Sequence, residues 1–483
     1  MQNGTQAEAR QLDEQSDRAL PKIEGGELKP PVSLPVDHHR RPLPVFIVAG
    51  IAALAGLLFG YDTGIISGAI LFIRKDFALS AGTEGFVVSA VLFGATLSSV
   101  LSGRLADRLG RRTVLLVASL FFIVGSLVGA FATSVVVLVI SRFVLGLAIG
   151  VASFTAPLYI SEIAPPNVRG RLVGLNQLAI TLGILLSYVV DFSFAKSGQW
   201  DWMIGLGAVP GLLLGLGMFF LPESPRWLIL RGQSEKARKV LQEVRGRSDV
   251  SAEWNEIQET LKGEQGAWRE LLKPWLRPML IVGVGLAFFQ QFTGINTVIY
   301  YAPTIFQLAG FHSNSSSILA TIGVGLVNAV MTVVAISLID RVGRRPLLLI
   351  GLVGMALSLF ALTMGFAGVF GLAELKWIGV LSLMAYVASF AISIGPVFWL
   401  MISEIYPLRL RGLAMSLATG ACWACNLIVT FTFLLLIQAL GAAGTFGLLG
   451  VITLAAVLFS YFLVPETKDR SLEQIEHDVR LTK

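Results

Sequence analysis

The chain has 483 residues, of which 54% are hydrophobic and only 14% are charged, and its mean hydropathy is +0.74. A water-soluble protein of this length has too little interior to bury so much apolar surface, so the composition argues against a soluble globular protein. The net charge of +6 comes from basic residues that punctuate the apolar runs instead of forming one stripe, which argues against nucleic-acid binding.

Residues 1–44 are polar and lack the apolar core of a secretory signal peptide, so we expect a disordered cytoplasmic tail. Beyond this tail, apolar runs alternate with short polar loops. A helix needs about 20 apolar residues to cross a bilayer. On this criterion the predicted spans are 45–73, 86–105, 113–132, 136–158, 172–192 and 203–221, followed by 278–308, 315–339, 346–368, 377–403, 411–438 and 444–464.

Basic residues gather in alternate loops, which predicts the orientation of the chain. After the second, fourth, eighth and tenth spans they are Arg104, Arg108, Arg111, Arg112, Arg169, Arg171, Arg341, Arg344, Arg345, Arg409 and Arg411. The loops on the other side carry few basic residues. Because positively charged loops stay in the cytoplasm, we expect a multi-pass protein of the cell (inner) membrane with both termini cytoplasmic.

One long hydrophilic segment separates the two sets of spans. Its composition favours short amphipathic helices, so we expect a cytoplasmic helical linker. A separate catalytic domain is the alternative, but about 50 residues without cysteine or histidine make a poor enzyme. The predicted domains are a tail at 1–44, a six-helix bundle at 45–222, the linker at 223–275, a second six-helix bundle at 276–466 and a cytoplasmic tail at 467–483.

Three motifs occur twice, in the same order and after corresponding spans. The pairs are 103–112 with 340–345, 161–170 with 403–412, and 222–226 with 465–468. We therefore predict a parallel repeat of six spans. Such repeats are typical of alternating-access transporters, which bind their substrate between the two halves.

The repeated motifs place acidic residues beside the arginines at matched positions. A topology signal alone would not require these acids, so we expect ion-pair networks that hold helix ends together and separate when the cytoplasmic side opens. The alternative is a topology signal whose charges also pair. The residues predicted for this cytoplasmic gate are Asp107, Arg111, Glu162, Arg169, Glu223, Arg226, Asp340, Arg344, Glu404 and Arg411.

These motifs, together with Gln-Gln-Phe-Thr-Gly-Ile-Asn at 290–296, resemble those of the sugar porter family of the major facilitator superfamily. The resemblance covers 45–470. It implies an all-α membrane protein with the major facilitator fold, in which twelve transmembrane helices form two six-helix bundles joined by a cytoplasmic helical linker. The family includes proton symporters for xylose, galactose and arabinose, inositol carriers and facilitative glucose transporters.

Polar side chains inside a bilayer are costly and are therefore candidates for the binding site. Amides both donate and accept hydrogen bonds, as sugar hydroxyl groups do, and aromatic rings cover the apolar faces of a sugar. The candidates are Phe59, Gln177, Gln290, Gln291, Asn296, Tyr300, Asn328, Trp399 and Trp423. Hydrogen bonds between helices are the alternative, chiefly for Asn176 and Asn426. Ile184 and Cys422 depart from the pattern of xylose symporters of this family and favour a hexose or a broader sugar range.

Asp62 lies deep in the first predicted span, where an unpaired carboxylate is costly. A stripe of glycines at positions 56, 60, 64 and 68 should pack against a neighbouring helix, and Asp62 points away from it. Arg142 in the fourth span lies at a compatible depth, so we predict an ion pair. Asp62 is the one acidic residue expected in the interior, and no histidine lies in a predicted span. Proton coupling is therefore assigned to Asp62 and Arg142, and a purely structural pair is the alternative.

The predicted function is proton-coupled symport of a monosaccharide, a hexose or a pentose, by alternating access. Facilitative relatives carry Asn at the position of Asp62, which favours symport over a uniporter for a sugar or for a polyol such as myo-inositol. A non-transporting sugar sensor is an alternative of another class. We expect no enzyme and no cofactor, with the proton gradient as the energy source. The expected partners are the sugar, the proton and the lipid bilayer, without nucleic acid, and we expect a monomer to function.

Overall fold

A backbone inside lipid must satisfy its own hydrogen bonds, so apolar runs of this length form long helices. The computed structural model describes residues 45–165, 168–246, 249–262, 268–271, 273–369, 371–407 and 410–468. Within these ranges every regular element is helical and there is no strand. Among the described residues, eleven helical segments are long and apolar enough to span a membrane, and the last of them contains two spans. The prediction of an all-α membrane protein is confirmed.

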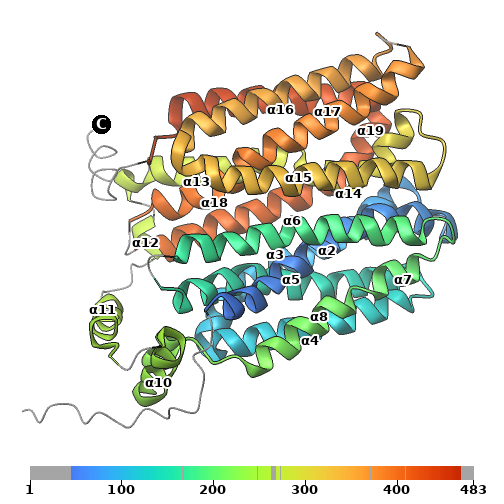
Figure 1. Cartoon of the computed structure of the whole chain (residues 1–483). Coiled ribbons are helices and arrows are strands. Elements are labelled where there is room, and N and C mark those ends of the chain that lie inside the picture. The colour runs from blue at the N-terminus through green and yellow to red at the C-terminus, as the bar shows by residue number, and fades with distance from the viewer. Residues whose placement is uncertain are drawn as a thin grey trace, which may run out of the picture. The chain divides into compact units, whose positions relative to one another are not determined.

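The first half of the chain forms six spans from seven helices (Figure 1). These helices are α2 (Val45–Asp76), α3 (Ala81–Leu109), α4 (Arg111–Ala130), α5 (Val135–Ile163), α6 (Arg169–Phe194), α7 (Trp200–Gly205) and α8 (Ala208–Phe220). Helices α7 and α8 together make the sixth span, Trp200–Phe220. The predicted spans lie close to these helices, and the largest extension is in α3, which begins before the predicted boundary at 86.

The second half forms the remaining six spans, two of which are broken. Its helices are α13 (Arg277–Phe292), α14 (Ile295–Leu308), α15 (Asn314–Val342), α16 (Arg344–Phe366), α17 (Leu372–Ile392), α18 (Ile394–Glu404) and α19 (Arg411–Leu463). The seventh span is divided between α13 and α14 at Gly294, whose φ of 95° favours glycine. The tenth span is divided between α17 and α18 at Ser393. The sequence predicted both spans but neither break.

The last two spans are joined by one residue instead of the loop predicted between 438 and 444. Gly441 has φ 71° and ψ 173° inside α19, outside the helical range. The chain folds back at this point. The evidence is the distance of 6.3 Å between the ring centroids of Phe433, before Gly441, and Phe446, after it. In a straight helix these two residues would be about 20 Å apart along the axis. A glycine with positive φ therefore replaces a whole loop.

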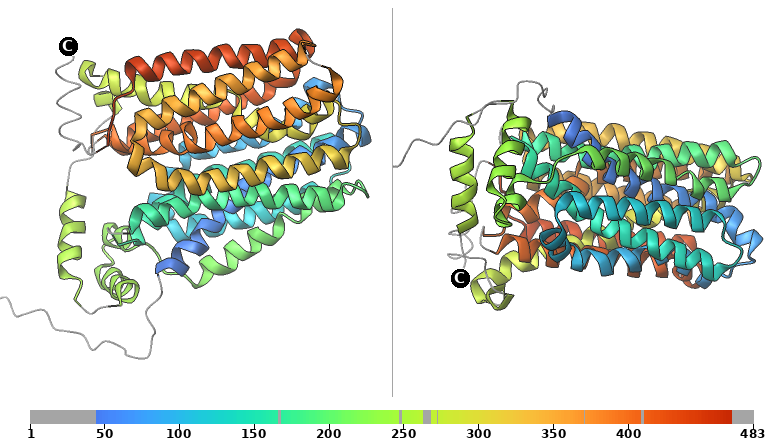
Figure 2. Two further views of the ribbon diagram at one scale, coloured as in Figure 1. Left: turned by 45° about the horizontal axis from the view of Figure 1, so that its top comes forward. Right: turned by 90° about the horizontal axis from the view of Figure 1, so that it is seen from below.

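Short helices connect the two halves. They are α9 (Pro225–Leu230), α10 (Ser234–Arg245), α11 (Ser251–Lys262), α12 (Trp268–Leu271) and a 3-10 turn at Pro274–Leu276. Figure 2 shows α10 and α11 beyond the ends of the spanning helices. Arg245 ties them together, since it pairs with Glu253 of α11 at 2.5 Å and donates to the carbonyl of Ile163 in α5 at 2.6 Å. The predicted domain boundaries stay predictions, and the tail at 1–44 and the chain after Lys468 lie outside the described residues.

The glycine stripe of α2 packs on α6, as predicted. At Gly60 an added Cβ would lie 1.9 Å from the carbonyl oxygen of Ile180, so the two backbones are in direct contact. Gly64 faces Ser187 and Gly68 faces Asp191 in the same way. We call this contact the α2–α6 seam. Because a glycine seam leaves little freedom to rotate, it determines which residues of α2 face the other helices.

The halves meet through α2 with α14, α3 with α19 and α6 with α15. We call the end of the helices where α3 meets α4 and α15 meets α16 the basic end, and the opposite end the far end. Near the far end Arg74 Nη2 donates to Gln307 Oε1 at 3.0 Å. Leu71, Ala195 and Ile318 form an apolar cluster between the halves at the same end. The far end is therefore closed by contacts between the halves.

The seam predicts a large difference between two glycines of one helix. Gly60→Ala should lower the stability of the protein by about 1–3 kcal/mol or more, because the new methyl group must push α6 away. Gly50→Ala is the matched control, since nothing lies within 4 Å of the added Cβ. Thermal unfolding of the purified protein in detergent measures both. Equal unfolding temperatures for the two variants would contradict the backbone contact.

Candidate functional site

Asp62 of α2 and Arg142 of α5 form a buried ion pair. Arg142 Nη1 lies 2.5 Å from Asp62 Oδ1 and Nη2 lies 3.2 Å from Oδ2, so the contact is bidentate. The exposed fraction is 3% for Asp62 and 0% for Arg142. The α2–α6 seam leaves Asp62 on the face of α2 toward α5, as the sequence predicted. The pair holds α2 to α5 for as long as Asp62 is ionised.

Three predicted binding residues form a hydrogen-bonded cluster around the break in the seventh span. Asn296 Nδ2 donates to Gln291 Oε1 at 2.7 Å. Gln291 Nε2 donates to Cys422 Sγ of α19 at 3.1 Å, and Cys422 Sγ donates to Gln290 Oε1 at 3.2 Å. The thiol thus completes the cluster with the three amides. These side chains offer both donors and acceptors to a ligand.

Polar side chains also hold the two broken spans together. Tyr386 of α17 donates its hydroxyl to the carbonyl of Thr293 at 2.8 Å, in the break between α13 and α14. Gln290 Nε2 donates to the carbonyls of Ile394 and Gly395 at 3.3 Å each, at the start of α18. Because unpaired backbone groups are costly in lipid, these bonds stabilise the breaks. Gln290 therefore has a structural role as well as its predicted role in binding.

The predicted aromatic contacts lie on α2, α14, α18 and α19. The rings of Phe59 and Trp423 lie 5.4 Å apart and connect the two halves. Trp399 of α18 packs edge-on against Phe398 at 4.8 Å and is 40% exposed. Tyr300 of α14 is buried. The structure therefore brings Phe59 and Trp423 together, whereas Trp399 is partly exposed.

The two remaining predicted amides lie on facing helices of opposite halves. Gln177 is half-buried on α6 and Asn328 is buried on α15. In the described part of the chain neither side-chain amide makes a hydrogen bond with protein. Both amides are therefore available to a ligand at the α6–α15 contact between the halves.

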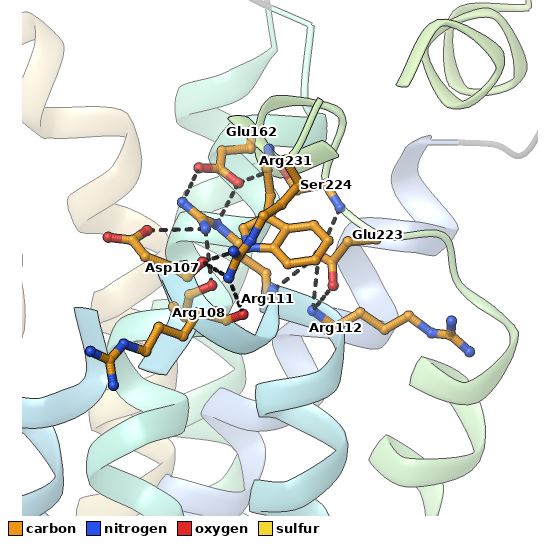
Figure 3. A network of polar contacts seen from close by, with 10 residues as sticks. Asp107, Arg108, Arg111, Arg112, Glu162, Glu223, Ser224 and Arg231 are labelled. Atoms are coloured by element: carbon orange, nitrogen blue, oxygen red, sulfur yellow. Dashed lines mark hydrogen bonds and ion pairs between the residues drawn. The ribbon is translucent and has the colours of Figure 1, made fainter. Parts of the chain in front are cut away.

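At the basic end of the first half, Arg111 is the centre of a charge network (Figure 3). Its Nε and Nη2 donate to both oxygens of Glu162, at 2.9 and 3.0 Å. Its Nη1 lies 3.1 Å from Asp107 Oδ1. Ser224 donates its hydroxyl to Glu162 at 2.5 Å. The ends of α3, α4, α5 and the start of α9 are joined by these contacts.

Glu223 completes this network through the backbone. It accepts the backbone N–H of Arg111 at 3.0 Å and that of Arg112 at 3.1 Å, at the start of α4 (Figure 3). The first N–H groups of a helix have no partner within it, so a carboxylate is well placed there. Burial raises the pKa of Glu223, although these backbone hydrogen bonds act in the opposite direction.

The second half repeats the arginine–glutamate core of this network. Arg344 donates to both oxygens of Glu404, at 3.0 and 3.3 Å, and Thr467 donates its hydroxyl to Glu404 at 2.5 Å. Glu466 accepts the backbone N–H groups of Arg344 and Arg345 at 3.0 Å. Burial acts to raise the pKa of Glu466, but four backbone N–H groups outweigh it and hold that pKa below its ordinary value.

Comparison with known protein families agrees with the resemblance that the repeated motifs indicated. The sequence profile of the family described as Sugar (and other) transporter matches residues 48–479. The chain belongs to this family. Its members are transporters, so the expectation that the chain is not an enzyme is confirmed.

Family members of known name match nearly the whole chain. The D-xylose transporter of Levilactobacillus brevis is 45% identical over 431 residues, which cover 89% of this chain and 94% of that protein. The galactose-proton symporter of Escherichia coli K12 is 42% identical over 437 residues, covering 90% and 94%.

Solved structures of one family member share the fold. The inward-open conformation of the xylose transporter XylE from E. coli matches with a TM-score of 0.78 at 34% identity, covering 90% of this chain and 99% of that one. XylE bound to 6-bromo-6-deoxy-D-glucose, described as a proton:xylose symporter of the major facilitator superfamily, matches with a TM-score of 0.74. The predicted major facilitator fold is confirmed.

Not every predicted gate residue joins the networks of this transporter. Arg169 is exposed and Arg226 is half-buried, and among the described residues neither forms an ion pair. The side chains of Asp340 and Arg411 lie outside the described part of the structure. Each observed network lies within one half. The gating role of the set stays a prediction.

The expectation of one acidic residue in the interior is wrong. Asp191 of α6 and Glu84 of α3 are buried as well. Each lies at or just outside an end of a predicted span, where polar residues ordinarily reach the membrane surface, so the pattern gave no reason to bury them. Ser224 and Thr467 were also missed, although both repeated motifs place a hydroxyl residue directly after the glutamate.

The first network predicts a strong effect of one arginine. Arg111→Met leaves Glu162 buried without its cation and should lower the free energy of unfolding by about 3–5 kcal/mol. Arg169→Met, the matched control, should change it by less than about 0.5 kcal/mol, because Arg169 is exposed. Thermal unfolding of the purified variants is the measurement. A similar loss in both would show that the Arg111–Glu162 contact is not stabilising.

Proposed function

We propose that the chain is a proton-coupled symporter that carries a monosaccharide, a hexose or a pentose, across the cell membrane by alternating access. The observation that carries this proposal is the buried Asp62–Arg142 pair beside an uncharged, amide-rich set of binding candidates. Relatives named for D-xylose, and for galactose and arabinose with protons, support it. The proton gradient supplies the energy, and no cofactor takes part.

The substrate class follows from the side chains around the contact of the two halves. The amides of Gln177 and Asn328 have no protein partner among the described residues, and the cluster around Gln291 presents further donors and acceptors. An uncharged ligand rich in hydroxyl groups satisfies such amides without burying an unpaired charge. Trp399 and the Phe59–Trp423 pair offer flat apolar surfaces for the C–H faces of a sugar ring.

Coupling depends on the protonation of Asp62. The ionised carboxylate holds both terminal nitrogens of Arg142, whose Nε is already buried without a partner. A proton on Asp62 removes the charge that compensates Arg142, so the guanidinium must find other acceptors. Helix α2, which carries Asp62, packs against α14 of the second half. The protonation of a pair in the first half is thus communicated to a helix of the second half.

The conformation supports an inward-facing state. The contacts that close the far end join the two halves, whereas the two charge networks at the basic end each stay within one half. We assign the basic end to the cytoplasm, with both termini there, because of its arginines. In this proposal the charge networks brace each half, and the opening on the cytoplasmic side runs between the halves. In this proposal a monomer is sufficient.

The coupling role predicts a separation of two activities. In lightly buffered, de-energised cells the wild-type protein should raise the external pH when its sugar is added, and glucose, galactose, xylose, arabinose and myo-inositol form the panel. Asp62→Asn should abolish this rise and uphill accumulation but retain labelled-sugar counterflow, because a neutral residue mimics the protonated state. Unchanged accumulation in the variant would refute the proton role of Asp62. Counterflow without any pH rise in the wild type would indicate a uniporter, and binding without flux a sensor.

The binding role predicts an effect on sugar affinity. Gln177→Leu should raise KM for the sugar by roughly 2- to 12-fold, the equivalent of one hydrogen bond of about 0.5–1.5 kcal/mol. The folded protein should keep its unfolding temperature, because this amide has no protein partner to lose. Gln438→Leu makes the same exchange at an exposed position of α19 and is the control. Equal KM values for both variants and the wild type would remove Gln177 from the site.

A further inference from the structure

Asp191 is a buried carboxyl group that the proposed function does not use. It lies in the last turn of α6, at the far end, and its exposed fraction is 0%. Oδ2 accepts the backbone N–H of Gly68 at 3.1 Å. Oδ1 is buried without a hydrogen-bond partner. One oxygen of this carboxyl is therefore bound and the other is not satisfied.

The α2–α6 seam provides the space for this side chain. A Cβ at Gly68 would lie 2.3 Å from Asp191 Cγ, so any other residue at position 68 would displace the carboxyl group. The glycine also exposes its own N–H to Oδ2. Asp191 is thus held in a site formed by the backbone of α2, which fixes its place beside the first span.

No cation compensates Asp191 in the described part of the chain. The titratable groups near it are Tyr188 on its own helix and Tyr61 on α2, whose hydroxyl groups donate to the carbonyls of Ile299 and Met203. The arginines of the neighbouring elements are engaged elsewhere, Arg142 with Asp62 and Arg74 with Gln307. An ionised carboxylate without a partner is strongly unfavourable in lipid-enclosed protein, whereas a protonated one is neutral. Its environment is the opposite of that of Asp62.

The position of Asp191 connects it with both the ion pair and the far end. Gly68 follows Asp62 by six residues, which is about 9 Å along α2. Tyr61, which directly precedes Asp62 in α2, donates its hydroxyl to the carbonyl of Met203. Tyr188, one turn before Asp191, donates its hydroxyl to the carbonyl of Ile299 in the second half at 3.1 Å. Asp191 therefore adjoins one of the contacts that join the halves.

We propose that Asp191 is a second proton-binding group of this carrier. It holds a proton on its carboxyl group while the far end is closed, and it exchanges that proton with water when the far end opens. An ionised Asp191 would oppose closure, because closure would bury an uncompensated charge. The link to transport rests on the proposed function, but the protonation of Asp191 in the closed state does not.

Infrared spectroscopy of the full-length protein in lipid tests the protonation directly. The C=O stretch of a protonated carboxyl group should be present in Asp62→Asn, and with ¹³C-labelled aspartate it should shift, which separates it from the glutamate Glu84. The double variant Asp62→Asn/Asp191→Asn should lose this labelled band. If the double variant does not fold, the labelled band in Asp62→Asn alone decides. Its absence there, or its persistence in the double variant, would overturn the proposal.

Counterflow tests the link to conformational change. In Asp62→Asn, sugar counterflow should slow as the pH rises from mildly acidic to alkaline, because Asp191 then loses its proton. In the double variant with Asp191→Asn this alkaline fall should be lost. A purely structural role would slow counterflow equally at every pH, and that result, or an unchanged pH profile, would overturn the link. Uphill accumulation in the wild type, which tests the proposed function, is a separate measurement.

Discussion

At Gly60 the backbone of α2 comes so close to the carbonyl of Ile180 in α6 that no side chain fits between them. This contact recurs one turn away in each direction, so α2 cannot rotate without separating the two helices. Its orientation then decides the chemistry of the first half. Asp62 faces α5 and reaches Arg142, while Gly68 faces α6 and receives Asp191. The same seam thus creates one compensated and one uncompensated carboxyl group.

The two halves are repeats, but they differ where they meet the ligand candidates. The first and fourth spans, α2 and α5, are continuous helices and carry the ion pair. Their counterparts in the repeat, the seventh and tenth spans, are broken, and the seventh carries the amide cluster of Gln290, Gln291 and Asn296. A break exposes backbone carbonyls, and Gln290 and Tyr386 satisfy them. The ion pair of the first half therefore lies in continuous helices, whereas the amide cluster of the second half lies at a broken one.

Features that depend on spacing along one helix were predictable from the sequence. Apolar length predicted the spans, the four-residue spacing of glycines predicted the seam, and the helical angle between Gly60 and Asp62 predicted the side on which the carboxylate lies. The repeated motifs predicted that Arg111 and Arg344 would meet Glu162 and Glu404. These features needed only helix geometry and the order of the motifs.

Features that depend on how helices approach one another were not predictable. A single glycine at 441 replaces a loop because of its backbone conformation, which composition does not reveal. Asp191 stands at a position where a polar residue ordinarily meets the headgroups, and only the packing of Gly68 against it shows that it is buried. The contacts of Gln290 with the tenth span likewise join residues about 100 positions apart.

Each charge network is completed by residues that follow the last span of its half. Glu223 and Ser224 come after the sixth span, and Glu466 and Thr467 after the twelfth, yet they fasten helices made much earlier. On the ribosome, the first half therefore cannot be fastened until all six of its spans have emerged. A nascent chain that stops short of residue 223 leaves Glu162 without its hydroxyl donor and the start of α4 without its carboxylate. The charge network of each half can therefore form only after the last residues of that half have been synthesised.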